Sequence, residues 1–393
     1  MKFCAVICEY NPFHNGHAYQ LKEIRARSGC EKILCLMSGN FTQRGEPAVL
    51  GKFQRAKHAI QNGADVVLEL PAPFAVSPAE IFADGAVHLL SSLPAVTTLA
   101  FGCESGEKED FLTAARALLN EDKDFKAALK ERMKDGTSYI RARNALLLSL
   151  GQDIDEALLS SPNNILGTEY CRAILACGSQ IDPLPLPRVG GGYADSTLHD
   201  NFSSATALRA VLGDDSKKVK KALKSNLPAD VFADVEGLRP LPYEKVALAA
   251  LISASNAEVA ATPDCSEGLE NRLKSLAKSN PDFGDLLSKA VSKRYTLTRL
   301  KRILLQNLLK IRLKDVKNYL KAPLYFKVLA VKKQGAEETL SELSGGYPLI
   351  ARKSDYSLLK KEALDCFTTD LFAGDLYGVL TGIYENEFQT LFV

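Results

Sequence analysis

"CEYNPFHNGHAYQL" spans residues 8–21 and joins an apolar, strand-like run to a segment with helical periodicity. It holds two of the five histidines of the chain, His14 and His17, with Gly16 between them. A loop between a strand and the next helix of a parallel sheet lies at the carboxyl end of the strand, where ligands bind. The helix start there offers unpaired N–H groups and partial positive charge, which suit phosphate. The stretch therefore predicts an α/β sheet with an anion site at its first turn.

The segments around this loop repeat the same alternation of strand and helix. Each strand-like run is apolar throughout, which is typical of strands covered on both faces of a parallel sheet. The predicted strands cover 3–8, 32–39, 65–71 and 97–103, and the predicted helices cover 17–29, 52–64 and 79–93. We therefore expect residues 1–215 to form a Rossmann-like parallel-sheet domain that binds ATP.

The rest of the chain is mostly helical in pattern. Residues 107–150 are charged and helix-like, and we interpret them as an insertion. Further helices are expected at 160–178 and 203–213, a strand end and exposed glycine-rich loop at 182–196, and a strand at 324–332. We place a boundary near 215, so that residues 216–393 form a mainly helical C-terminal region.

The composition limits the function classes. The formal net charge of the 393-residue chain is +2, so any polyanion-binding surface must be local. The nine cysteines are scattered and contain no CxxC pair, which favours buried free thiols in a reducing compartment over disulfides or a zinc site. No apolar run approaches the length of a membrane span, and the N-terminal run is too short for a signal peptide. We expect a cytoplasmic protein without a membrane partner.

The two histidines allow more than one interpretation. At a helix start they add side-chain donors to a phosphate site and would stabilise charge that develops at an α-phosphate. The HxxH spacing also suits a metal, but the sequence offers no obvious third ligand, and we predict no metal site. One histidine could instead be a purely structural residue. The position of the pair between a strand and a helix favours the phosphate site.

A basic segment lies in the C-terminal region. Residues 289–321 contain eleven lysines and arginines and one acid, whereas the rest of the chain is net negative. Such local density favours a polyanion surface, with Tyr295 and Tyr319 as possible base-stacking residues. The alternative is a solvated basic face on a helix whose leucines face the core. Our candidates for RNA contacts are Lys293, Arg294, Lys301 and Arg302.

Several motifs resemble a known family. "FHNGH" resembles the HxGH motif of the nucleotidyltransferase superfamily, and "SSATALR", residues 203–209, resembles its second motif. Two motifs in the right order are more specific than one. With "MSGNFTQRGEPA", "ELPAPFAVSPAEIFADGAV", "FGCESG", "SPNNILGTEY" and "KRYTLTRLKRILL", nearly the whole chain resembles the bacterial tRNA(Met) cytidine acetate ligase family.

The resemblance implies an activity. A member would activate acetate with ATP as acetyl-adenylate, accompanied by Mg²⁺, and transfer the acetyl group to the wobble cytidine of elongator tRNA(Met), giving N4-acetylcytidine. His14, His17 and Arg209 would be catalytic. ATP contacts would be Ile7, Cys8, Glu9, Tyr10, Asn11, Pro12, Phe13, His14, Asn15, Gly16, His17, Ala18, Tyr19, Gln20, Gly102, Asn163, Arg188, Ser203 and Thr206. Family members often carry two basic residues at the last arginine site, whereas here Pro187 precedes Arg188.

Other possibilities stay open at the level of sequence. The loop "QRGEPA", residues 43–48, could line the acetate or cytidine pocket or be an exposed loop with a local ion pair. The protein could also be a small-molecule adenylyltransferase, which the basic helices argue against. A non-catalytic RNA-binding protein that retains an ATP site is a third possibility. Acetate-dependent pyrophosphate exchange distinguishes the acetate ligase from the small-molecule adenylyltransferase. A turnover assay tests for the non-catalytic protein.

Overall fold

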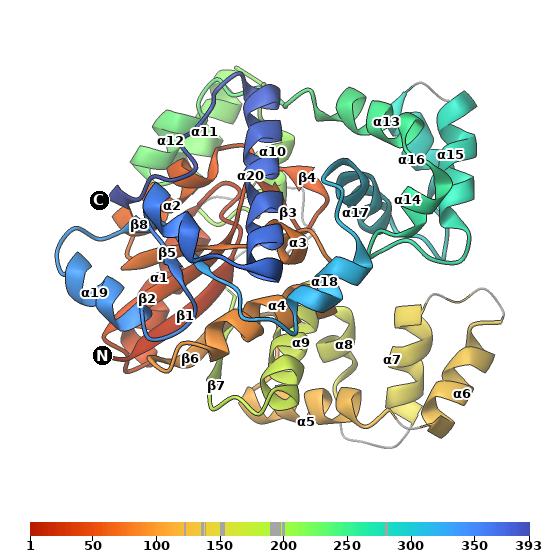
Figure 1. The fold of residues 1–393 in the computed structure, drawn as a ribbon, viewed down its shortest axis with the longest axis horizontal. Coiled ribbons are helices and arrows are strands. Elements are labelled where there is room, and N and C mark those ends of the chain that lie inside the picture. The colour runs from red at the N-terminus through yellow and green to blue at the C-terminus, as the bar shows by residue number, and fades with distance from the viewer. Residues whose placement is uncertain are drawn as a thin grey trace.

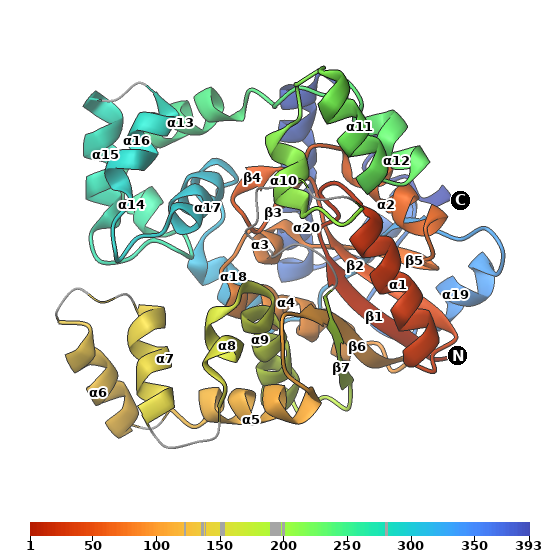
Figure 2. The same cartoon turned by 180° about the vertical axis from the view of Figure 1, so that it is seen from behind.

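The computed structural model describes the chain except residues 122, 135–136, 138, 150–153, 189–197, 199–200 and 280–281, and only the backbone of 139–140. The predicted glycine-rich loop therefore lies largely outside the described residues. Figures 1 and 2 show a central sheet with helices on both faces and two helical groups that extend to one side.

Five parallel strands form the core of the sheet, in the order β5-β2-β1-β6-β7. Their bounds are β1 (Phe3–Cys8), β2 (Lys32–Ser38), β5 (Val66–Leu70), β6 (Val96–Cys103) and β7 (Asp182–Pro187). The predicted parallel core is confirmed, and the predicted strand runs agree with the observed ones to within one or two residues. The strand order runs outward from β1 in both directions, so a crevice opens at the carboxyl end of β1.

Alternate residues of the strands separate the two faces of the sheet. Phe3 and Ala5 belong to the core with helices α4 (Ala79–Ser91) and α9 (Pro162–Ala176). Cys4 and Val6 belong to the core with α1 (Asn15–Arg27) and α2 (Lys52–Gln61). All four strand residues are at most 1% exposed. Burial on both faces explains why the run has no polar alternation.

The C-terminal region adds strands to this sheet. β8 (Phe326–Val331), at the predicted position, pairs antiparallel with β5, and β9 (Leu349–Ile350) and β10 (Leu391–Phe392) pair with β8. The sheet is therefore mixed, because β8, β9 and β10 are parallel to one another and run against the five core strands. A separate small ladder joins β3 (Phe41–Thr42) to β4 (Glu46–Pro47).

The remaining helices form three groups (Figure 1). The predicted insertion comprises α5 (Lys108–Leu119), α6 (Lys123–Arg132) and α7 (Tyr139–Ser149), followed by α8 (Glu156–Ser160). A second group comprises α13 (Tyr243–Ser253), α14 (Asn256–Ala260), α15 (Leu269–Ser279), α16 (Phe283–Ala290) and α17 (Leu297–Leu308). The helices nearer the sheet are α3 (Ala72–Ala75), α10 (Ala205–Ala210), α11 (Lys217–Asn226), α12 (Ala229–Val235), α18 (Leu313–Tyr319), α19 (Ala336–Leu343) and α20 (Lys361–Thr381), with a 3₁₀ turn at Lys353–Leu358.

The segment after residue 215 does not leave the sheet at once. Val219 and Leu223 of α11 and Val231 of α12 belong to the same core as α1 and α2. The boundary near 215 stays a prediction about the separate functions of the two regions, because C-terminal elements pack on the N-terminal sheet.

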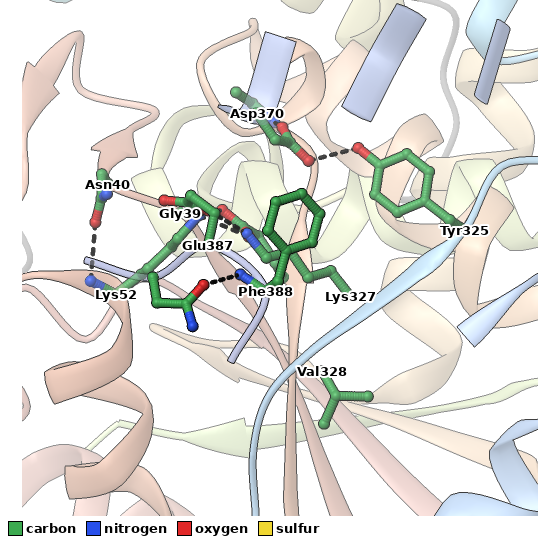
Figure 3. Close-up of polar contacts among 12 residues, drawn as sticks. Gly39, Asn40, Lys52, Tyr325, Lys327, Val328, Asp370, Glu387 and Phe388 are labelled. Atoms are coloured by element: carbon green, nitrogen blue, oxygen red, sulfur yellow. Dashed lines mark hydrogen bonds and ion pairs between the residues drawn. The ribbon is translucent and has the colours of Figure 1, made fainter. Parts of the chain in front are cut away.

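A buried charge cluster links the C-terminal segment to the sheet. Lys52 of α2 and Lys327 of β8, each 1% exposed, both pair with Glu69 of β5 and with Glu387. Figure 3 shows Lys52, Lys327 and Glu387 meeting, with Asn40 accepting the backbone N–H of Lys52. Two ammonium groups face two carboxylates, so the cluster is neutral when complete.

Candidate active site

The loop after β1 turns sharply before α1 begins. Tyr10 has a φ of +49°, a left-handed conformation that is costly for a bulky residue. Its side chain is 1% exposed and packs against the rings of Phe13 and His17, with centroids 4.8 Å away in both cases. The buried aromatic ring holds the backbone in this conformation and thereby brings His14 to the N-cap of α1.

The two histidines have defined hydrogen bonds at one nitrogen each. His14 Nδ1 accepts the backbone N–H of Gly16 at 3.0 Å, and His17 Nδ1 accepts the backbone N–H of His14 at 3.3 Å. The rings are stacked, with centroids 3.7 Å apart. A neutral imidazole that accepts at Nδ1 carries its proton on Nε2. Both rings therefore offer an Nε2–H donor at the start of the helix.

Gly16 makes this arrangement possible. A Cβ at position 16 would lie 2.8 Å from His14 Cε1, closer than two carbon atoms can pack. The glycine lets the ring of His14 fold over the first turn of the helix. The sequence motif thus reflects a packing requirement as well as access for a ligand.

Both histidines are neutral at pH 7. Burial lowers the pKa of His14 to about 3, with further lowering by Arg188 and Arg209. Burial also lowers the pKa of His17, followed by the effects of His14 and Arg188. Neutral donors bind the oxygens of a phosphate without taking up a proton.

This neutrality predicts how the stability depends on pH. In the unfolded chain His14 has a pKa of about 6.5, so below that pH the unfolded state binds a proton that the folded state does not. The contribution of His14 is complete above pH 6.5 and is lost as the pH falls toward 3. We expect a loss of about 1 kcal/mol from His14 between pH 6.5 and 5.5, because the unfolded histidine is already half protonated at pH 6.5. Urea unfolding at pH 6.5 and 5.5 measures it, and His14→Asn should have a smaller pH dependence; an equal slope in both proteins contradicts the assignment.

Arg209 reaches this loop from α10. Its NH1 donates to the carbonyl of Asn11 at 2.7 Å, and its Nε lies 3.3 Å from Glu46 Oε1. Ser204 caps α10 by accepting the N–H of Ala207. The second sequence motif is therefore placed beside the first, although about 190 residues separate them.

The opposite wall comes from β6, α9 and the end of β7. A Cβ on Gly102 would lie 3.4 Å from Arg188 Cγ and 3.6 Å from Gln20 Nε2, so these three residues are adjacent. Asn163, at the start of α9, donates to Glu104 at 2.6 Å. Gly102, Asn163 and Arg188 thus come from these elements, and Gln20 reaches Gly102 from α1.

One pocket contains most of the predicted residues. The space inside it amounts to about 1330 Å³, part of which is open solvent. The predicted residues that line it are Ile7, Cys8, Glu9, Tyr10, Asn11, His14, Gly16, His17, Tyr19, Gln20, Gly102, Asn163, Arg188, Ser203 and Arg209. Pro12, Phe13, Asn15, Ala18 and Thr206 are not among the lining residues.

Those five have other surroundings. Phe13 is fully buried in the core, and Asn15 Nδ2 donates to the carbonyl of Ser225 at 2.9 Å. The hydroxyl of Thr206 is buried and has no hydrogen-bond partner among the described residues. Their prediction as ATP contacts followed from their place in the motifs, and it remains untested.

Several lining residues were not predicted as ATP contacts. Gln43 and Arg44 come from the loop whose role the sequence left open. The others are Glu23, Phe82, Phe101, Leu166, Tyr170, Leu186, Pro187, Phe202 and Ala205. Most are apolar, and a sequence pattern does not distinguish an apolar pocket wall from the core.

The loop 43–46 also contacts the basic helix α17. Gly45 has a φ of +78°, and a Cβ there would collide with the backbone of Lys301 and Arg302. Lys301 Nζ lies 3.3 Å from Glu46 Oε2, so Glu46 bridges Arg209 and Lys301. The second turn of the basic helix therefore contacts the loop whose residues Gln43 and Arg44 line the pocket.

The four RNA candidates differ in their surroundings. Lys293 is exposed, and Arg294 is about one-third exposed and pairs with Glu267. The guanidinium of Arg302 is 13% exposed and holds Asp264 with two hydrogen bonds, of 2.8 and 3.0 Å. Arg302 is thus engaged within the protein, whereas Lys293 faces solvent.

Neither metal sites nor membrane spans appear in the described part of the chain. No group of three or more His, Cys, Asp or Glu side chains there is arranged to hold a metal ion. None of the described helices is both long and apolar enough to cross a membrane. All nine cysteines are described and free, and six are buried.

Comparisons with known proteins identify the family of this chain. The family model described as HIGH Nucleotidyl Transferase matches residues 1–390. A tRNA(Met) cytidine acetate ligase of Caldanaerobacter subterraneus is 37% identical over 98% of this chain and 96% of its own. One of Clostridium kluyveri is 36% identical over 97% and 95%.

Solved structures are similar over the whole chain. The crystal structure of Thermotoga maritima TmcAL in its apo form I has a TM-score of 0.91 at 31% identity, with 100% of both chains covered. The form II structure of that protein, bound with alpha-thio ATP, has a TM-score of 0.89 with the same coverage and identity. The chain therefore belongs to the HIGH nucleotidyl transferase family and, within it, to the tRNA(Met) cytidine acetate ligases.

Proposed function

We propose that this protein is an ATP-dependent ligase that acetylates the wobble cytidine of elongator tRNA(Met). Acetate would first attack the α-phosphate of ATP to give acetyl-adenylate and pyrophosphate. The acetyl group would then pass to the N4 amine of the cytidine. The observation that carries the proposal is the joining of His14, His17, Arg188 and Arg209 around one pocket, in a chain of this family.

The first step needs charge stabilisation more than proton transfer. Acetate is ionised at pH 7 and is already a nucleophile. The Nε2–H groups of His14 and His17 would donate to oxygens on which negative charge accumulates. Arg209 would face the pyrophosphate leaving group, and Arg188 would face the nucleotide from the opposite wall.

Mg²⁺ would enter with the nucleotide. The histidine N–H groups and arginines at the phosphate end do not ligate Mg²⁺, and Glu9 is the carboxylate that lines the pocket there. The described residues include no group of three metal-ligating side chains, and Mg²⁺ in nucleotide sites is usually held by the phosphates with one or two carboxylates. The ion would be held mainly by the phosphates and would neutralise part of their charge.

The tRNA would approach along α17 and the preceding turn, with the reaction in the cytoplasm, where tRNA is found. Residues 1–215 would supply the ATP site and residues 216–393 most of the tRNA surface. The contact between Gly45 and α17 supports this division, because Gln43 and Arg44 of the same loop line the pocket.

Two lysines on this path, the exposed Lys293 and the half-buried Lys301, should govern tRNA affinity. Replacing Lys293 and Lys301 with alanine should weaken binding and reduce the salt slope by about 0.7–0.9 per lost phosphate contact. Filter binding across a salt series measures both quantities. Arg302→Ala is the contrasting variant, since loss of its ion pair with Asp264 should lower stability instead. Wild-type affinity and slope in the double lysine variant would move the RNA surface elsewhere.

Mass spectrometry of tRNA nucleosides tests the function directly. After incubation with ATP and acetate, we expect N4-acetylcytidine in elongator tRNA(Met) and none when acetate or ATP is omitted. Acetate-dependent exchange of labelled pyrophosphate into ATP without acetylcytidine would restrict the activity to the first step. Pyrophosphate exchange that is independent of acetate would indicate a different adenylyltransferase.

A further inference from the structure

We propose that Glu9 is the general base of the second step and takes the proton from the attacking N4 amine of the cytidine. The inference rests on the proposed function and assigns a separate chemical role within the same pocket. Glu9 follows β1 directly and lines the pocket beside Arg44 and Arg209.

The chemistry of the second step calls for a base. The lone pair of the exocyclic amine is conjugated with the cytosine ring, so the nitrogen is a weak nucleophile. As the C–N bond forms, one N–H proton must leave, and it would pass to the Glu9 carboxylate. The bond between the acetyl carbon and the phosphate oxygen then breaks, and AMP departs. Because a phosphate is a stable anion, the leaving group needs no added proton.

The histidines cannot supply this base as they are placed. The Nδ1 atoms of His14 and His17 accept backbone N–H groups, and their Nε2 atoms carry hydrogen. Protonation of either ring at Nδ1 would break a hydrogen bond that caps α1 and would put a positive charge in a buried site. They are suited to donate to phosphate, and the proton acceptor must be another group.

The other acceptors near the pocket are less suitable. Glu23 lies eight residues into α1 from Asn15, about 12 Å along the helix from its start. The thiol of Cys8 stays protonated, because burial and the neighbouring Cys35 raise its pKa well above the usual value. Glu46 is already paired with Arg209 and Lys301. Glu9 remains as the carboxylate at the phosphate end.

The surroundings of Glu9 suit this role. Its Oε1 accepts the backbone N–H of Gln43 at 2.7 Å, and no described residue hydrogen-bonds Oε2. Arg55 fixes the backbone beneath by donating to the Glu9 carbonyl at 2.6 Å. Burial raises the pKa of the carboxyl, opposed by the Gln43 N–H, Arg44 and Arg209. A raised pKa brings a carboxylate closer to the working pH of a general base.

The test compares Glu9→Gln with Glu9→Ala. Glutamine keeps an oxygen that accepts the Gln43 N–H but cannot take up the proton, whereas alanine loses both functions. Enzyme loaded with acetyl-adenylate is mixed with tRNA, and the single-turnover transfer rate is compared with acetate-dependent pyrophosphate exchange. We expect the transfer rate of Glu9→Gln to fall by about 10²- to 10⁴-fold, and exchange by far less.

The pH profile provides a second readout. The charged and titratable groups that face Glu9 are Arg44 and Glu46 from the loop, Arg209 from α10 and Arg55 from α2. The arginines keep their charge across the working range. In the wild type, transfer should rise with pH as Glu9 ionises, and the residual transfer of Glu9→Gln should lack that rise.

Two results would overturn the proposal. Transfer by Glu9→Gln within tenfold of the wild-type rate would limit Glu9 to anchoring Gln43. An equal fall of exchange and transfer would move its role to ATP or acetate binding. Failure of the proposed function looks different, since wild-type enzyme would then show neither acetate-dependent exchange nor transfer.

Discussion

His17→Ala should lower the rate of acetyl-adenylate formation by about two to three orders of magnitude. The substitution removes an Nε2–H donor from the start of α1, where charge would develop on the α-phosphate. Loss of one preorganised donor of this kind typically has an effect of this size. ATP binding should change much less, because the pocket has many other contacts. Acetate-dependent pyrophosphate exchange measures the rate, and calorimetry measures nucleotide affinity.

His17→Asn is the matched control for the structural role of the ring. His17 Nδ1 accepts the N–H of His14, and an asparagine oxygen can replace this acceptor without offering the same donor to phosphate. We expect His17→Asn to unfold closer to the wild type than His17→Ala does, with exchange equally slow in both. Wild-type exchange in either variant would remove His17 from catalysis.

The second large effect concerns stability. Glu387→Ala should lower the free energy of unfolding by about 3–5 kcal/mol, as when one partner leaves a buried ion pair. Lys52 and Lys327, each 1% exposed, would then share Glu69 alone, and the cluster would carry an excess positive charge (Figure 3). Urea unfolding at pH 7 measures the loss.

Two further variants make this result specific. Glu338→Ala removes an exposed carboxylate from α19 and should change stability by less than about 0.5 kcal/mol. Replacing Lys327 and Glu387 together with methionine and leucine removes one charge of each sign. This pair should restore part of the stability lost in Glu387→Ala. An unchanged unfolding midpoint in Glu387→Ala would show that the cluster does not depend on this carboxylate.

The parallel core could be predicted because its signals are local. The run at Phe3–Cys8 and its successors are short, apolar and followed by helical patterns, and burial on both faces requires this composition. The antiparallel placement of β8 could not be predicted. It depends on pairing between Val66 and Val331, far apart in sequence, and neither strand encodes its partner.

The candidate site was likewise predictable only in part. The glycine, the spacing of the two histidines and the helix start made it possible to predict that both rings lie at the start of α1. The apolar wall around Phe101 and Tyr170 was not predictable, since such residues also fill cores. Charge density likewise could not distinguish exposed Lys293 from Arg302, because the latter's partner, Asp264, lies outside the basic segment.

The antiparallel strand β8 delays completion of the sheet during synthesis of this protein. β5 is complete by residue 70, but its neighbour β8 begins at residue 326. At about 5–20 residues per second, the edge of β5 waits on the order of 10–50 s for its partner. During that interval the nascent chain carries an apolar edge strand that can pair with another chain. Lys327 then adds a positive charge to the sheet before its partner Glu387 has been translated. The sheet of the nascent chain therefore stays incomplete, or must be protected from other chains, until nearly the whole chain has been translated.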